Sequence, residues 1–262
     1  MIEIVESGVL TTVQDHGRPG RAHIGVPESG AVDRALAARC NRVVGNIDDA
    51  AVLETVGGLR IRAVSAVTVA TDVESVARSL GVGDEIELGV GGRQWHYVAV
   101  RGGIDVSPVL GSRSTDTLSG LGPPPVRTGD RYRTGAEPSN PPIGDVAPVR
   151  TPDAIARVEP GPRLDWFATD TLDWMRSRRW TIGAASRVGL RLIGEPMPRV
   201  RHDELPSEGL VRGSIQVPPD GAPIMMLADH PTTGGYPVVA VVHPDDVATV
   251  AQLMAGSVFR FG

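Results

Sequence analysis

The sequence TTVQDHGRPGRAHIGVPESGAVDRALAARCNRVVGN, residues 11–46, joins two contrasting patterns. Its first half is rich in Gly, Pro and short polar side chains, which predicts an irregular loop. Its second half predicts an amphipathic helix, because apolar residues recur there at helical spacing. Ser29 is expected to cap this helix, and Gly45-Asn46 is expected to end it. The apolar stripe consists of Val32, Leu36, Cys40 and Val43.

The loop part of this stretch carries side chains that can bind a ligand: Gln14, Asp15, His16, Arg18 and Arg21. A long ordered loop of this polarity is costly to fold unless it builds a site. The alternative is a polar surface loop that only connects two elements. Composition alone gives the two interpretations equal weight.

Short β-type runs punctuated by glycine-rich turns fill much of the remaining chain. Such spacing favours a small barrel or sandwich over alternating βαβ units. The predicted strands are 2–5, 52–56, 59–63, 66–70, 85–88, 95–100, 190–192, 215–217, 224–227, 238–242 and 258–261. Helices are predicted at 170–177 and 245–254, and Asp48-Asp49 is a candidate cap for a short helical turn.

The last predicted helix should place Val247, Val250 and Met254 on one face and stop at Gly256. Residues 123–148 are heavy in Pro, Gly and polar side chains, which predicts a domain boundary or linker. We therefore expect domains at 1–148 and 149–262, with the N-terminal strand able to pair with either one.

Composition excludes several classes of function. The net charge is −5, no stretch is strongly basic and only 4% of residues are aromatic, which argues against a nucleic-acid-binding protein. All 26 basic residues are arginine, so the chain has no phosphate-loop lysine, no Schiff-base lysine and no lysine to carry biotin.

Cysteine usage and hydropathy bear on the compartment. Cys40 is the only cysteine, which excludes an internal disulfide. The N-terminus shows no signal segment and no apolar run is long enough to span a bilayer, so a cytoplasmic protein with no membrane partner is expected.

Common catalytic signatures are missing from the sequence. There is no G-x-S-x-G elbow, no phosphate-binding loop and no H-E-x-x-H motif. The six histidines are scattered without ligand spacing, so no metal site is predicted.

A second candidate site lies in residues 205–236. The apolar strand 224–227 should deliver four polar residues to its end: Asp229, His230, Thr232 and Thr233. Gln216 should project from a neighbouring strand. Gly234-Gly235 would let backbone amides approach an anionic or carbonyl ligand closely. A tight hairpin turn at 232–235 explains the same residues equally well.

Several motifs along the chain closely resemble those of the allophanate hydrolase subunit 2 family, also described as biotin-dependent carboxyltransferase-like. In the first half they are the TTVQD-x-GR, GVP-x-SGA-x-D and N-x-VVGN segments within residues 11–46. In the second half they are VEPGP at 158–162, GLRL at 189–192 and IQVP to TTGGYP at 215–237. Cys40, Val188, His230 and Pro231 depart from the family pattern.

The resemblance implies a mainly β fold with a few helices, made of two cyclophilin-like β-barrels in one chain. It implies a subunit of a heteromeric ATP-dependent 5-oxoprolinase, which opens 5-oxoproline to glutamate. The implied partners are a related allophanate hydrolase subunit 1 or KipI-like protein and a LamB/YcsF-type protein. No cofactor is expected on this chain alone, and ATP would act through the partner subunits.

Two alternatives stay open. One is a carboxyltransferase subunit of a biotin-dependent urea or amide carboxylase, using carboxybiotin that another protein carries. The other is a non-catalytic regulatory subunit that binds a kinase-inhibitor-like partner.

Activation of a small amide needs donors for the developing oxyanion and a base that relays a proton. Asp15, Asp229 and Gln216 are the catalytic candidates. The predicted substrate-binding residues supply guanidinium, hydroxyl and backbone donors: Arg18, Ser29, Arg113, Ser114, Arg187, Thr232, Thr233, Gly234, Gly235 and Tyr236. A surface ion pair is the alternative for each arginine.

Overall fold

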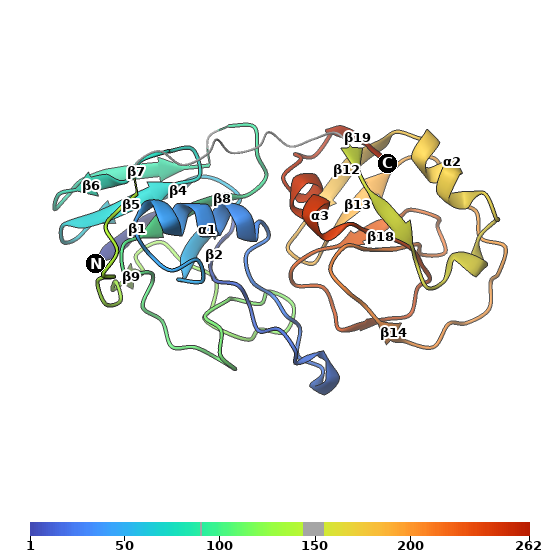
Figure 1. Cartoon of the computed structure of the whole chain (residues 1–262), viewed down its shortest axis with the longest axis horizontal. Coiled ribbons are helices and arrows are strands. Elements are labelled where there is room, and N and C mark those ends of the chain that lie inside the picture. Colours follow the sequence, from blue (N-terminus) through green and yellow to red (C-terminus); the bar gives the residue numbers. More distant parts are fainter. Residues whose placement is uncertain (90, 144–154) are drawn as a thin grey trace. The chain divides into compact units, whose positions relative to one another are not determined.

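A computed structural model describes residues 1–89, 91–143 and 155–262 of the chain (Figure 1). The chain divides into two compact units, one formed by residues 1–19 and 29–151 and the other by residues 20–28 and 152–262. The predicted class, mainly β with a few helices, is confirmed. The predicted boundary at 148/149 lies outside the described residues.

The first unit is built on two antiparallel sheets with the strand orders β7-β4-β1-β9 and β2-β3-β8-β5-β6. Its strands are β1 (Ile2–Ser7), β2 (Thr11–Gln14), β3 (Val52–Thr55), β4 (Leu59–Ala63), β5 (Val67–Thr71), β6 (Arg78–Leu80), β7 (Glu85–Leu88), β8 (His96–Val100) and β9 (Arg131–Tyr132). The N-terminal strand β1 pairs with β4 and β9, which places it in this unit.

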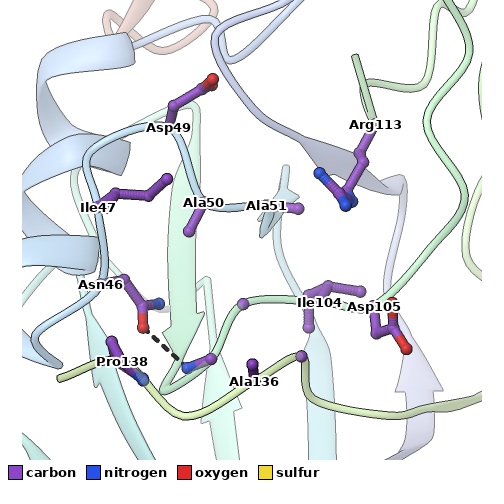
Figure 2. A pocket seen from close by; sticks show the side chains of 13 residues that line it. Asn46, Ile47, Asp49, Ala50, Ala51, Ile104, Asp105, Arg113, Ala136 and Pro138 are labelled. Atoms are coloured by element: carbon purple, nitrogen blue, oxygen red, sulfur yellow. Dashed lines mark hydrogen bonds between the residues drawn. The ribbon is translucent and has the colours of Figure 1, made fainter. Parts of the chain in front are cut away.

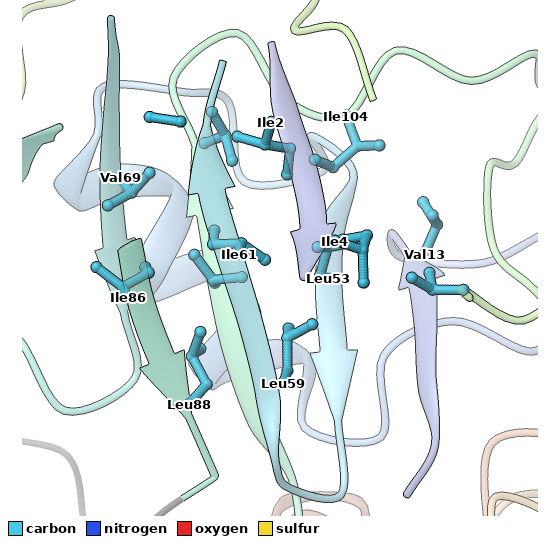
Figure 3. Close-up of a cluster of buried hydrophobic side chains, with 14 of the residues drawn as sticks. Ile2, Ile4, Val13, Leu53, Leu59, Ile61, Val69, Ile86, Leu88 and Ile104 are labelled. Carbon is cyan, nitrogen blue, oxygen red and sulfur yellow. The ribbon is translucent and has the colours of Figure 1, made fainter. Parts of the chain in front are cut away.

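Apolar side chains from both sheets form the core of the first unit (Figure 3). Strand β4 shows the period of two that produces it, since Leu59 and Ile61 are fully buried while Arg60 and Arg62 alternate with them and remain partly exposed. Ile2 and Ile4 of β1 join the same cluster.

The structure of residues 11–46 differs from two of the predictions. Thr11–Gln14 is strand β2 rather than irregular loop, and all four residues pair with β3 and are buried. β-branched Thr and Val suit a strand, and this local preference outweighs the Gly and Pro that follow. The helix α1 (Arg34–Val43) begins after Asp33, whose carboxylate accepts from the backbone nitrogen of Leu36 at 3.0 Å.

Ser29 is therefore not the N-cap. Its backbone has a φ of 55°, in the left-handed region, so it turns the chain before the helix starts. The predicted end of the helix is confirmed, because Gly45 has a φ of 78° and its nitrogen donates to the Arg42 carbonyl oxygen at 2.9 Å. Helix α1 packs on β8 and β5.

The predicted linker is wrong over 123–143, which belongs to the first unit. Within this segment β9 pairs with β1, and the nitrogen of the buried Val126 donates to the Thr11 carbonyl oxygen at 2.9 Å. Pro and Gly here shape an ordered loop that packs on the sheet. Residues 144–148 lie outside the described residues.

The second unit is organised by an eight-stranded, nearly closed barrel sheet with the order β10-β19-β12-β13-β16-β15-β18-β11. Its strands are β10 (Ile155–Ala156), β11 (Val158–Pro160), β12 (Trp180–Ala185), β13 (Gly189–Ile193), β15 (Ser214–Gln216), β16 (Ile224–Met226), β18 (Val238–Val242) and β19 (Val258–Phe261). Strands β14 (Glu208–Gly209) and β17 (Thr233–Gly234) form a separate pair.

The helices of the second unit are short. They are η1 (Ala22–Ile24), η2 (Leu164–Trp166), α2 (Thr171–Ser177) and α3 (Pro244–Ala251). Val247 and Val250 are buried as predicted, but Met254 is 48% exposed because α3 ends before it. Asp48-Asp49, in the first unit, form a turn without a helix.

Candidate functional site

The carboxylate of Asp15, just after β2, collects four hydrogen-bond donors. Oδ1 accepts from the hydroxyls of Ser112 and Ser114, each at 2.6 Å, and from the Gly17 nitrogen at 2.8 Å. Oδ2 accepts from the backbone nitrogen of Arg113 at 2.6 Å. Asp15 is 6% exposed, so these donors replace the water that a carboxylate otherwise binds. The last residue of the TTVQD motif therefore fixes the backbone of Arg113.

Arg113 lines a pocket of about 430 Å³ in the first unit (Figure 2). The volume is at the lower end of the roughly 300–1,000 Å³ of small-molecule sites. The pocket is formed by loops that follow α1, β8 and β9. Its lining residues are Asn46, Ile47, Asp49, Ala50, Ala51, Gly102, Gly103, Ile104, Asp105, Arg113, Gly135, Ala136 and Pro138.

The Arg113 side chain is fixed through its Nε atom, and the end of its guanidinium group stays accessible in the pocket. Its Nε donates to the Val106 carbonyl oxygen at 2.9 Å. Figure 2 shows the guanidinium reaching toward Ala51 inside the pocket. Within the described part of the chain, the guanidinium makes no ion pair. A fixed, planar, unpaired guanidinium is suited to binding a carboxylate or phosphate.

Closely packed backbone segments form one wall of the pocket. Gly102 has a φ of 90°, and a Cβ there would lie 2.7 Å from the Gly135 carbonyl oxygen. The Gly102 nitrogen donates to Oδ1 of Asn46 at 2.8 Å, and Nδ2 of Asn46 donates to the Val100 carbonyl oxygen at 2.9 Å. Only glycine fits this close approach, and the buried Asn46 amide holds the two loops together.

Arg18 and Ser29 lie beside the Asp15 network rather than on the pocket. Arg18 is 2% exposed, and its Nη2 donates to the Ser114 carbonyl oxygen at 2.5 Å. Ser29 is fully buried, and its hydroxyl donates to the Thr115 carbonyl oxygen at 3.2 Å. Both side chains therefore support the loop that carries Arg113, and their predicted contact with substrate stays a prediction.

In the second unit, Arg187 and Asp229 bind each other. Nε and Nη2 of Arg187 donate to the two carboxylate oxygens of Asp229, each at 2.8 Å, and both side chains are 0% exposed. A bidentate pair sealed from water balances two charges that would otherwise be costly to bury. The catalytic role predicted for Asp229 and the substrate contact predicted for Arg187 stay predictions.

Gln216 and Gly234 are tightly packed neighbours. Nε2 of Gln216 donates to the Tyr236 carbonyl oxygen at 2.9 Å. A Cβ added at Gly234 would lie 2.5 Å from that same Nε2, so a larger residue there would force the Gln216 amide to move. The side chain of Tyr236 is 45% exposed.

The remaining predicted residues form an exposed ribbon next to this pair. Strand β17 pairs with β14 rather than forming a tight hairpin turn at 232–235. The Thr232 carbonyl oxygen accepts from the Leu210 nitrogen at 3.0 Å, while Thr233 and Gly235 are exposed. The predicted site residues thus fall into two groups, one in each unit.

Comparison with known proteins identifies the family of the chain. The family profile described as carboxyltransferase domain, subdomain A and B, matches residues 24–262. The chain belongs to this carboxyltransferase family. The family-level resemblance predicted from the sequence motifs is therefore confirmed.

Similar proteins include 5-oxoprolinase subunits and urea amidolyases. The chain is 32% identical to a 5-oxoprolinase subunit of Escherichia coli, over all of this chain and 90% of that protein. It is 30% identical to the urea amidolyase of Lachancea kluyveri, over 99% of this chain but only 17% of that protein. It superposes on the crystal structure of Kluyveromyces lactis urea carboxylase with a TM-score of 0.90 and 26% identity, covering 99% of this chain and 27% of that one.

No group of three or more His, Cys, Asp or Glu residues in 1–89, 91–143 and 155–262 is arranged to hold a metal ion. None of the helices in the same ranges has the length and apolar character that crossing a membrane requires.

Sequence reasoning missed several residues around the candidate sites. Asp49 and Asp105 line the pocket, and the only signal for Asp105 was its place after Gly102-Gly103. In the second unit, Nη2 of Arg199 donates to the Val217 carbonyl oxygen, and burial lowers the pKa of Arg199. No motif marked Arg199, because it lies in an irregular segment before β14.

Proposed function

We propose that this chain is a subunit of a heteromeric, ATP-dependent 5-oxoprolinase that opens 5-oxoproline to glutamate. The observation that carries the proposal is the 32% identity to a bacterial 5-oxoprolinase subunit, across the whole chain and 90% of that relative. A related allophanate hydrolase subunit 1 or KipI-like protein and a LamB/YcsF-type protein are the proposed partners. ATP is proposed to act through them.

The pocket of the first unit supports this proposal chemically. 5-Oxoproline is small and carries one carboxylate beside its ring amide. The fixed guanidinium of Arg113 matches that carboxylate, and the pocket volume of about 430 Å³ suits a ligand of this size. Asp15 is proposed to position Arg113 rather than to touch substrate, because four donors already surround its carboxylate.

The second candidate is a carboxyltransferase subunit acting on urea or a related amide. It is favoured by the family match and by the likeness to urea carboxylase. The chain contains no lysine, so biotin would be carried by another protein, and Arg113 would face the carboxyl group of carboxybiotin.

The test is ATP hydrolysis by this chain mixed with its two proposed partners, with and without 5-oxoproline. Stimulation of ATP hydrolysis accompanied by glutamate formation is the expected result. Carboxylation with added carboxybiotin, in the absence of that stimulation, would favour the second candidate. The absence of activity in both assays would contradict both enzymatic proposals and favour a regulatory binding subunit.

A further inference from the structure

The pocket of the first unit contains charges of opposite sign that do not neutralise each other. Arg113 and Asp105 both line it, and Figure 2 shows them on neighbouring parts of its wall. Within the described residues, no ion pair joins Arg113 to Asp105 or to any other carboxylate. A single ligand that carries one negative and one positive charge can bind both groups at once.

Each of the two charged groups is anchored through its backbone. The Arg113 nitrogen donates to Asp15 at 2.6 Å, and the Asp105 nitrogen donates to the Arg133 carbonyl oxygen at 3.0 Å. The Asp105 carboxylate makes no hydrogen bond within the described residues. The backbone at both positions is therefore fixed before a ligand arrives, while the exposed Asp105 carboxylate stays accessible to one.

The other pocket carboxylate is already engaged. Oδ1 of Asp49 accepts from the His16 nitrogen at 2.9 Å. The pocket lining also includes the apolar side chains of Ala50, Ala51 and Ile104. A short aliphatic chain fits this surface.

We infer that this pocket binds the α-amino acid head group of the ring-opened product, with the carboxylate on Arg113 and the ammonium group on Asp105. The identity of the ligand rests on the proposed function. Hydrolysis of the lactam C–N bond adds water: the carbonyl carbon gains a hydroxyl group that ionises, and the nitrogen gains hydrogen and is protonated at neutral pH. The new ammonium group is the feature that Asp105 recognises, because the lactam N–H carries no charge.

The experiment measures binding to the isolated chain by calorimetry. The probes are L-glutamate, 5-oxoproline and glutarate, which has the carbon chain of glutamate without the ammonium group. L-Glutamate is expected to bind about tenfold more tightly than either other probe, because one charge-assisted hydrogen bond contributes about that factor to the affinity. Arg113→Gln should weaken binding of all three probes, whereas Asp105→Asn should remove the preference for L-glutamate and leave glutarate binding unchanged.

Glu87→Gln is the matched control for loss of one exposed carboxylate, because Glu87 lies on β7 outside the pocket. The thermal midpoint of each variant shows that it is folded. Equal binding of L-glutamate and glutarate, absence of binding, or a preference that survives Asp105→Asn would overturn the inference. Such a result would leave the proposed function standing if 5-oxoproline still stimulated ATP hydrolysis in the complex.

Discussion

Arg187 and Asp229 are the clearest case in which a residue expected to act on substrate is held by another protein group. Sequence spacing placed Asp229 at the end of a buried strand, and the structure does so. No sequence pattern indicated that Arg187, 42 residues earlier, would occupy both of its oxygens. Pairing between distant strands depends on the sheet order, which local patterns do not encode.

The first prediction concerns this buried pair. Asp229→Ala leaves the Arg187 charge buried without its partner and should lower the free energy of unfolding by about 3–5 kcal/mol. Replacing both residues, as Arg187→Met with Asp229→Leu, should recover most of that loss. Urea unfolding measures both effects. An Asp229→Ala protein as stable as the wild type but inactive in the complex would show that Asp229 acts in catalysis instead.

The second prediction concerns Asp15. Asp15→Asn substitutes a donor group where two hydroxyls and two backbone nitrogens donate, and should lower the free energy of unfolding by about 2–3 kcal/mol. Ligand binding at Arg113 should weaken as well, because the Arg113 backbone loses its anchor. Asp48→Asn is the control, since Asp48 forms an exposed ion pair with Arg42. Equal effects of the two substitutions in urea unfolding would contradict the positioning role.

At the scale of elements, the periodic segments were predictable and the connections were not. Strands such as β4 and β18 and helix α1 follow from apolar spacing. Strand β2 was missed because its polar threonines are typical of a loop. In the folded unit these residues are buried and pair with β3, which makes them a strand. Short strands such as β9 and β14, of two residues each, exist only through their partners and leave no local pattern.

The third prediction concerns the N-terminus of α3 in the second unit. Arg157 lies between β10 and β11 and donates three hydrogen bonds to the Asp246 carboxylate, each at 2.8 Å. These bonds join this part of the barrel sheet to helix α3. They hold the pKa of Asp246 below its ordinary value of 3.8. A lowered pKa in the folded state means that Asp246 stabilises the fold above pH 3.8, and that this contribution is lost as the pH falls through the folded-state pKa.

Asp246→Asn should therefore lower the thermal midpoint at pH 7, and the difference from the wild type should shrink below about pH 4. Asp173→Asn, at an exposed carboxylate 3.6 Å from Arg176, is the control and should change little. A difference between wild type and Asp246→Asn that stays constant down to about pH 2 would contradict the account.

At the scale of the whole molecule, the sequence indicated the family and the mainly β class but not the pocket. Arg113 was the one predicted residue that lines it. The other lining residues come from loops after α1, β8 and β9, and only the folded first unit brings these loops together. Asp15 was correctly chosen as important, but its physical role, fixing the Arg113 backbone, depends on a contact across 98 residues.

The central claim is that Arg113 binds the substrate of a 5-oxoprolinase complex. It is tested most directly by 5-oxoproline-stimulated ATP hydrolysis of the reconstituted complex with Arg113→Gln in place of the wild-type chain. Arg127→Gln, at an exposed arginine outside the pocket, is the matched control. The account predicts a loss of kcat/KM of about tenfold or more for Arg113→Gln and none for Arg127→Gln. Full stimulation by the complex containing Arg113→Gln would contradict it.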